Sequence, residues 1–122
     1  MPTPQILQAN QDRLAAAPFD GLTLRLSGGE LVSCRKDLDA AQVNRDVAAL
    51  KPLNSSKLAN SSLSRYGGGD SGWASEGDWA QAERSVRLTA GAARAAGLCG
   101  VIFDVEPYMG NPSIRRSAAT GT

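Results

Sequence analysis

The sequence contains no histidine and only two cysteines among its 122 residues. Without histidine, Ser-His-Asp catalysis, Cys-His catalysis and histidine-ligated metal sites are excluded for this chain. Cys34 and Cys99 lie far apart in the sequence and match no metal-binding or redox cysteine motif. Cys99 directly precedes an apolar run, which predicts a buried and unreactive thiol. Any chemistry must therefore use carboxylates, arginine, tyrosine, serine or backbone groups.

A surplus of positive charge is also absent. Thirteen basic and twelve acidic residues give a net charge of +1, so nothing favours attraction to nucleic acid or to an anionic membrane. No apolar run approaches the roughly 20 residues that a membrane helix requires. The first residues lack the basic start and apolar run of a signal peptide, so a cytoplasmic location is the default expectation, although a lost N-terminal segment would hide a signal.

The apolar pattern alternates between helical and strand periods along one domain-sized chain, of which 42% is hydrophobic. Thr3 followed by Pro4 is typical of a helix start, and this helix should end before Pro18. The pattern predicts strands over 22–26 and 62–66, and a helix over 38–50 that Pro52 ends. A third helix follows, and then a strand from residue 100. This alternation predicts an α/β fold in which about three parallel strands alternate with three helices.

The third helix carries the clearest signals. Ser75 and Asp78 resemble a capping box, and Gly97 is placed to terminate the helix. Glu83 and Arg87 have the spacing of an i,i+4 ion pair. Steps of three and four residues predict a buried face formed by Trp79, Ala82, Val86, Ala90 and Ala93, and exposed side chains at Arg84, Arg87 and Arg94.

The glycine-rich segment 67–72, GGGDSG, formally matches the GxGxxG pattern of dinucleotide-binding sites. In such sites the third glycine lies in the first turn of the helix, so that the helix N-terminus faces the pyrophosphate. Here Trp73 and Ala74 intervene before the cap at Ser75. The segment is therefore interpreted as a loop, and no cofactor is predicted.

Two carboxylates end the last predicted strand, in the segment GVIFDVEPY over 100–108. Because side chains two residues apart share a face, Ile102, Asp104 and Glu106 lie together. The other face is apolar and should pack on helices. The acids lie at the carboxyl end of the strand, where α/β sheets and barrels carry their sites. Spacing alone leaves three alternatives open: general acid–base catalysis, divalent-cation binding, or solvated or arginine-paired acids without a function.

Two segments resemble a group of bacterial glycoside-hydrolase-like barrel proteins. They are APFDGLTLRL over 17–26 and GDWAQAERSVRLTAGAARAAGLCGVIFDVEPY over 77–108, which ends in an Asp-x-Glu-Pro-Tyr pattern. The resemblance implies a (β/α) barrel that acts on a glycosidic bond with carboxylates at its strand ends. By position it implies catalytic roles for Asp104 and Glu106, a substrate-binding role for Tyr108, and no metal.

The resemblance also predicts that the chain is a fragment. A complete barrel of this kind needs about 200 residues or more, and only three of eight strands are predicted here. We expect an incomplete barrel over residues 1–108 and an irregular tail over residues 109–122. The parent protein would bind carbohydrate and hydrolyse it, whereas the isolated chain is expected to be inactive.

Two other functions fit the same pattern. The first is a non-catalytic α/β module that binds a partner or self-associates through open sheet edges. The second is a metal-dependent phosphotransfer or lyase site built on Asp104 and Glu106.

Overall fold

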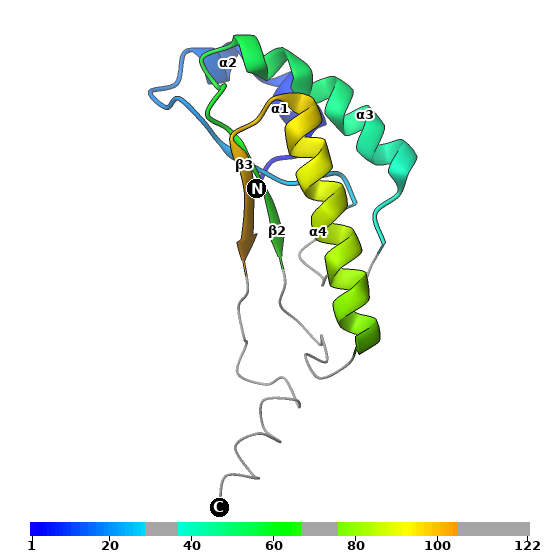
Figure 1. The fold of residues 1–122 in the computed structure, drawn as a ribbon. Coiled ribbons are helices and arrows are strands. Elements are labelled where there is room, and N and C mark those ends of the chain that lie inside the picture. The colour runs from blue at the N-terminus through cyan, green and yellow to red at the C-terminus, as the bar shows by residue number, and fades with distance from the viewer. Residues whose placement is uncertain (29–36, 67–75, 105–122) are drawn as a thin grey trace, which may run out of the picture.

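Three parallel strands form a single sheet in the computed structural model, which describes residues 1–28, 37–66 and 76–104. Strand β1 spans Thr23–Leu24, β2 spans Ser62–Tyr66 and β3 spans Gly100–Asp104, in the spatial order β1-β2-β3. Figure 1 shows β2 and β3 side by side. The register aligns Leu24 with Leu63 and Leu63 with Val101. Helical segments connect β1 to β2 and β2 to β3, so the predicted α/β fold with three parallel strands is confirmed.

The first predicted helix is divided into α1 (Pro4–Ala9) and α2 (Gln11–Ala15). The start was predicted correctly, because the Thr3 side chain caps α1 by accepting the Ile6 N–H at 3.4 Å. The break falls at Asn10, whose side-chain amide donates to the Ile6 carbonyl at 2.8 Å. The Asn10 N–H donates to Leu7 O instead, at 3.1 Å, so the side chain replaces the backbone N–H at the Ile6 carbonyl, which explains the division.

Helix α3 spans Ala40–Leu50 and is capped by the side chain of Asp39, which accepts the Ala41 N–H at 3.1 Å. The end predicted from Pro52 is confirmed, since the α-helix stops at Leu50. The chain then continues as a 3₁₀ helix, η1 (Lys51–Ser55), with Pro52 in its first turn. Proline is tolerated at that position because the N–H that it lacks would have no helical partner there.

Helix α4 spans Glu76–Ala96 and ends as predicted at Gly97, which has a φ of +71°. The Gly97 N–H donates to Arg94 O at 3.1 Å and the Leu98 N–H donates to Ala93 O at 2.9 Å. These two bonds form a Schellman motif, in which glycine is favoured because it has no Cβ. Ser75 lies outside the described residues, so the predicted cap stays a prediction.

The buried face of α4 was predicted only in part. Ala82 and Ala93 are buried and the three arginines are exposed, as expected, and the Glu83–Arg87 pair forms at 2.7 Å. Ala90 is exposed, and Trp79 is 50% exposed. The other buried positions on α4 are Ser85, Thr89, Ala92 and Ala96.

The buried face of α4 differs from the predicted face because small side chains let α4 approach α3 and the sheet closely. Thr89 is buried because its hydroxyl donates to the Ser85 carbonyl within the helix, at 2.9 Å. Such a bond satisfies a polar group that a hydropathy pattern assigns to solvent. The face of closest packing is therefore rotated away from Trp79.

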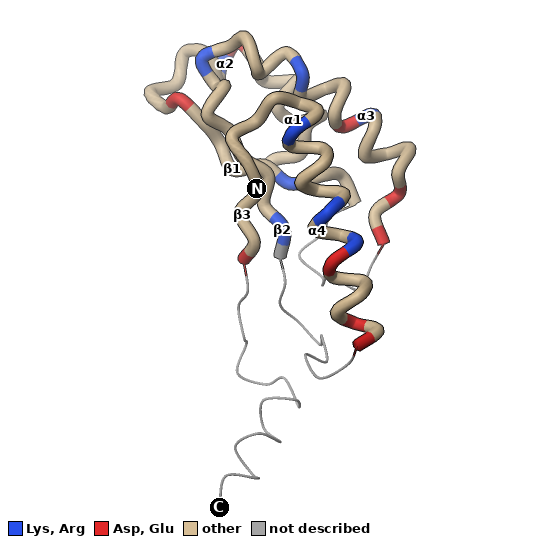
Figure 2. Tube along the Cα trace, in the orientation of Figure 1, with Lys and Arg blue, Asp and Glu red and all other residues tan. Residues whose placement is uncertain are grey.

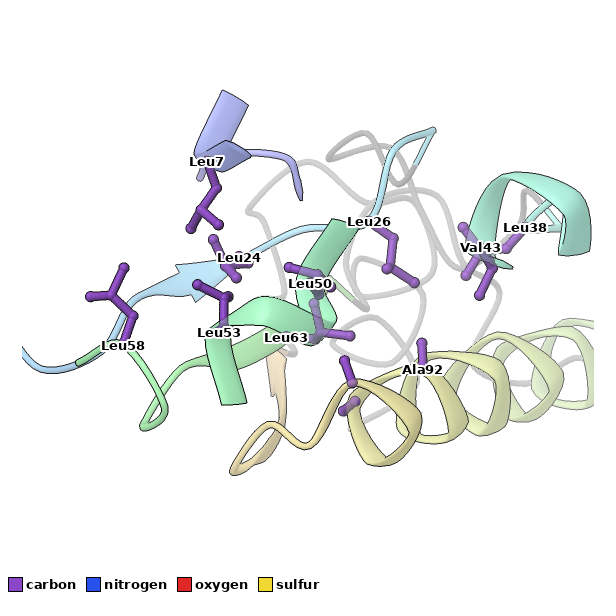
Figure 3. Packing of buried hydrophobic residues seen from close by; sticks show 12 residues of the cluster. Leu7, Leu24, Leu26, Leu38, Val43, Leu50, Leu53, Leu58, Leu63 and Ala92 are labelled. Atoms are coloured by element: carbon purple, nitrogen blue, oxygen red, sulfur yellow. The ribbon is translucent and has the colours of Figure 1, made fainter. Parts of the chain in front are cut away.

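Five leucines form the fully buried centre of the core, between the sheet and a layer made of α1, α3 and α4 (Figure 3). Contacts of α1 with α3, and of α3 with α4, place these helices on one side of the sheet (Figure 1). The opposite face carries Thr23, Ser62 and Ile102, and Ile102 is 47% exposed. Within the described ranges, none of the helices has the length and apolarity to cross a membrane. The central leucines are Leu7, Leu24, Leu50, Leu53 and Leu63.

The end of α4 provides a test of this fold. Gly97→Ala should lower the free energy of unfolding by about 1–2 kcal/mol, because a side chain is disfavoured at positive φ. In addition, the new Cβ would lie 2.6 Å from the Asn54 side chain. The matched control is Gly91→Ala within α4, where a Cβ meets open space. It should raise stability by about 0.5–1 kcal/mol. Urea denaturation measures both, and equal effects would contradict the assigned helix end.

Candidate functional site at the carboxyl edge of the sheet

The structure places one of the three predicted site residues. Asp104 is the last residue of β3, aligned with Tyr66 at the end of β2, and its side chain is half-buried. Figure 2 shows this acidic position at the carboxyl end of β3. Glu106 and Tyr108 lie outside the described residues, so their predicted roles stay predictions.

Strand alternation separates the two faces of β3 as the sequence predicted. Val101 packs against the core, and Phe103 lines a groove together with Trp79 and Val86 of α4. Asp104 therefore points to the face that the helices do not cover. The helix-facing side is covered less completely than expected, since Phe103 remains 38% exposed.

A buried arginine lies near the same edge but on the other face. Arg65 of β2 is 5% exposed and is aligned with Phe103, so it points toward the helices. Alternation directs Asp104 away from it. Of the alternatives left open by spacing, pairing of Asp104 with this arginine is therefore not favoured.

A buried carboxylate bonds the backbone just after the carboxyl end of β1. It was not predicted from the sequence. Asp46 of α3 is 0% exposed. Its Oδ1 accepts from Gln5 Nε2 at 2.7 Å and from Gln42 Nε2 at 3.0 Å, and its Oδ2 accepts the Ser27 N–H at 2.7 Å. The Ser27 hydroxyl lies 2.9 Å from Asp46 Oδ1 and 2.6 Å from Gln5 Oε1, and its single proton serves one of them. Asp46 thus joins α1, α3 and the chain that leaves β1.

Strand β1 is shorter than the predicted strand 22–26, and the chain beyond it bonds other segments. The Ser27 N–H bonds Asp46, and the Arg25 N–H donates to Pro2 O at 3.0 Å. The sequence signal for Asp46 was its position, because it lies three residues after Val43 and four before Leu50 on the same helical face. A carboxylate inside an apolar stripe indicates a buried polar network.

No metal centre emerges from the described part of the chain. Within residues 1–28, 37–66 and 76–104, no group of three or more cysteine or acidic side chains is placed to hold an ion. A cavity of about 310 Å³ is lined by Ser27, Asp37 and Asp39, and the Asp39 side chain already caps α3. The metal-dependent alternative therefore has no ligand cluster in these ranges.

The prediction of a buried Cys99 is wrong. The thiol is exposed, and its sulfur lies 3.8 Å from both Ala59 O and Asn60 Oδ1. Cys99 belongs to the short connection between α4 and β3, at the amino end of the strand, where the chain runs along the surface. It lies at the opposite end of β3 from Asp104.

Comparisons with known protein families, with curated proteins and with solved structures found no match to this chain.

The Asp46 network predicts a large effect of a small change. Asp46→Asn replaces an acceptor oxygen by an N–H donor that faces donors of Ser27, Gln5 or Gln42. It should lower the free energy of unfolding by about 1–3 kcal/mol, the cost of a buried donor without a partner. The control, Asp20→Asn in an exposed turn, should change stability by less than about 0.5 kcal/mol. Similar urea midpoints for the two variants would show that Asp46 does not organise this region.

Proposed function

We propose that the carboxyl edge of the sheet is part of the carbohydrate site of a glycoside-hydrolase-like (β/α) barrel, to which this chain contributes β1, β2 and β3. The observation that carries the proposal is the position of Asp104. It ends a parallel strand on the sheet face away from the helices, which is where a barrel presents its reacting groups.

The topology supports a barrel rather than a doubly wound sheet. Consecutive strands are neighbours in the order β1-β2-β3, and α3 and α4 contact each other on one side. A barrel keeps all its helices on the outer side of the strands, whereas a doubly wound sheet covers both faces.

In this proposal Glu106 is the residue that donates a proton to the leaving glycosidic oxygen or attacks the anomeric carbon. In the strand predicted from the sequence, Asp104 is its neighbour on the same face, about 6.5–7 Å away at the backbone. Asp104 positions Glu106 and adds negative charge beside the oxocarbenium-like transition state. A second catalytic carboxylate, about 5–5.5 Å away for retention or 6.5–9.5 Å for inversion, comes from another strand of the barrel. Tyr108 offers an aromatic surface to the sugar ring.

Carbohydrate binding is the first test. Oligosaccharides should shift the backbone amide resonances at the carboxyl ends of β2 and β3, including those of Arg65, Tyr66 and Asp104. In the Asp104→Asn variant these shifts should weaken, because a charged acceptor for sugar hydroxyls is lost. Heteronuclear NMR with a panel of sugars measures this. Resonance changes confined to the amino ends of the strands, or none with any sugar, would contradict the proposed site.

Turnover is the second test. The isolated chain should hydrolyse aryl glycosides little or not at all, because a barrel rim draws its catalytic groups from several strands. Of the two predicted catalytic acids, Asp104 lies in the described ranges. A single cluster of carboxylates on one strand rarely supplies both the general acid and the nucleophile. Glu106→Gln is the control. Turnover that disappears in this variant would show that the isolated chain is already a working enzyme, and turnover that persists would remove the catalytic role of Glu106.

A further inference from the structure

The outer edge of β3 exposes backbone hydrogen-bonding groups. Within the described part of the chain, β3 pairs with β2 on one side and ends the sheet on the other. The Ser62 N–H donates to Leu22 O beside β1 at 2.9 Å, so Ser62 and Ser64 direct their backbone groups toward β1, whereas Leu63 and Arg65 direct theirs toward β3. Because Ile102 is aligned with Ser64 in a parallel pair, Ile102 and Asp104 direct their N–H and C=O groups toward β2, and Val101 and Phe103 direct theirs toward the outer edge.

Apolar side chains surround this edge on both faces of the sheet. Ile102 is 47% exposed on the uncovered face, and Phe103 is 38% exposed on the helix-facing side. Phe103 also lines a groove of about 700 Å³ against α4, where Trp79 is 50% exposed. Edge strands in soluble proteins are usually protected by lysine, proline or a bulge, and β3 contains neither lysine nor proline. The edge is therefore suited to pairing with another strand.

We propose that two copies of this chain associate through β3, antiparallel about a two-fold axis at Ile102. In that register Ile102 lies opposite Ile102 of the second copy, and Asp104 lies opposite the second copy's Gly100. Val101 then lies opposite Phe103 of the second copy, so residues that direct their backbone groups outward meet each other, as an antiparallel ladder requires. The carboxylate faces a residue without a side chain. A register shifted by four residues would instead oppose two aspartates, which is unfavourable.

The charges of α4 favour the same arrangement. Glu76 and Asp78 lie in its first turn and Arg94 lies in its last, and Figure 2 shows the acidic end of this helix. An axis perpendicular to the sheet keeps both helical layers on one side and makes the two α4 helices antiparallel. The acidic end of one helix then lies toward the basic end of the other. This self-complementarity selects a second copy over an unrelated partner.

The inference applies to the isolated chain, because in a closed barrel a further strand would pair with this edge of β3. It uses the backbone edge and apolar side chains rather than the carboxylate of Asp104, so it can be tested separately from the carbohydrate proposal. Analytical ultracentrifugation of the full chain over a range of concentrations should show a monomer–dimer equilibrium. Ile102→Lys should raise the dissociation constant at least about tenfold, because each dimer loses two apolar contacts and gains two like charges. Leu88→Lys, at a 38% exposed leucine on α4, is the matched control and should leave the equilibrium unchanged.

The register is tested by disulfide trapping. In a background with Cys34→Ser and Cys99→Ser, Ile102→Cys places two cysteines at a non-hydrogen-bonded antiparallel pair. Their Cα atoms are then about 4.5 Å apart, within the range of a disulfide. Mild oxidation should give a covalent dimer for Ile102→Cys and not for Leu88→Cys. This variant also keeps the proposal testable if Ile102→Lys fails to fold, which circular dichroism would reveal.

Three results would overturn the proposal. The first is a monomer at every concentration, and the second is association that Ile102→Lys does not weaken. The third is association without trapping at Ile102, which would place the interface elsewhere. A chain that dimerises without binding sugar would contradict the carbohydrate proposal alone. A chain that binds sugar without dimerising would contradict the dimer proposal alone.

Discussion

The Asp46 carboxylate is the interaction on which the geometry of this domain depends most. It is fully buried and gathers donors from α1, from its own helix and from the backbone that leaves β1. A buried carboxylate is tolerated only when its oxygen atoms are fully hydrogen-bonded, so these segments cannot move apart independently. This requirement fixes the position of α1 over Leu24. It therefore also places Leu7 in the core.

The sheet that results has two unlike faces. Leucines of β1 and β2 meet leucines of the helices on one face, which supplies the apolar burial that drives folding. The other face carries short polar side chains and Ile102, and it ends at Asp104. The apolar face packs against the helices. The polar face suits either a solvent-exposed surface or the interior of a closed barrel. The carbohydrate proposal uses that asymmetry at the end of β3, and the dimer proposal uses the outer edge of the same strand.

Local signals were strong enough to predict most elements from sequence. Thr3 and Gly97 mark helix ends through their own backbone chemistry, and the alternation of side chains along β3 correctly assigned Asp104 and Phe103 to opposite faces. The failures involve interactions between distant segments. The break at Asn10 was a local exception, since asparagine can favour either a helix or a turn.

The site could be predicted less completely than the fold. Asp104 was placed correctly at a strand end, but its alignment with Tyr66 depends on the register between β2 and β3, which sequence periodicity does not give. Asp46 was missed because its partners Gln5 and Ser27 are 41 and 19 residues away in sequence. The rotated face of α4 was missed because buried Ser85 and Thr89 resemble solvent-facing residues in a hydropathy pattern.

Amide hydrogen exchange along β3 in dilute solution tests the central claim most directly, namely that β3 is the edge of a parallel sheet and ends at Asp104 on the uncovered face. Ile102 and Asp104 direct their N–H groups toward β2 and should exchange slowly. Val101 and Phe103 direct theirs toward the outer edge and should exchange much faster in the monomer. Uniform protection along the strand, or slow exchange at Val101 with fast exchange at Ile102, would contradict the account.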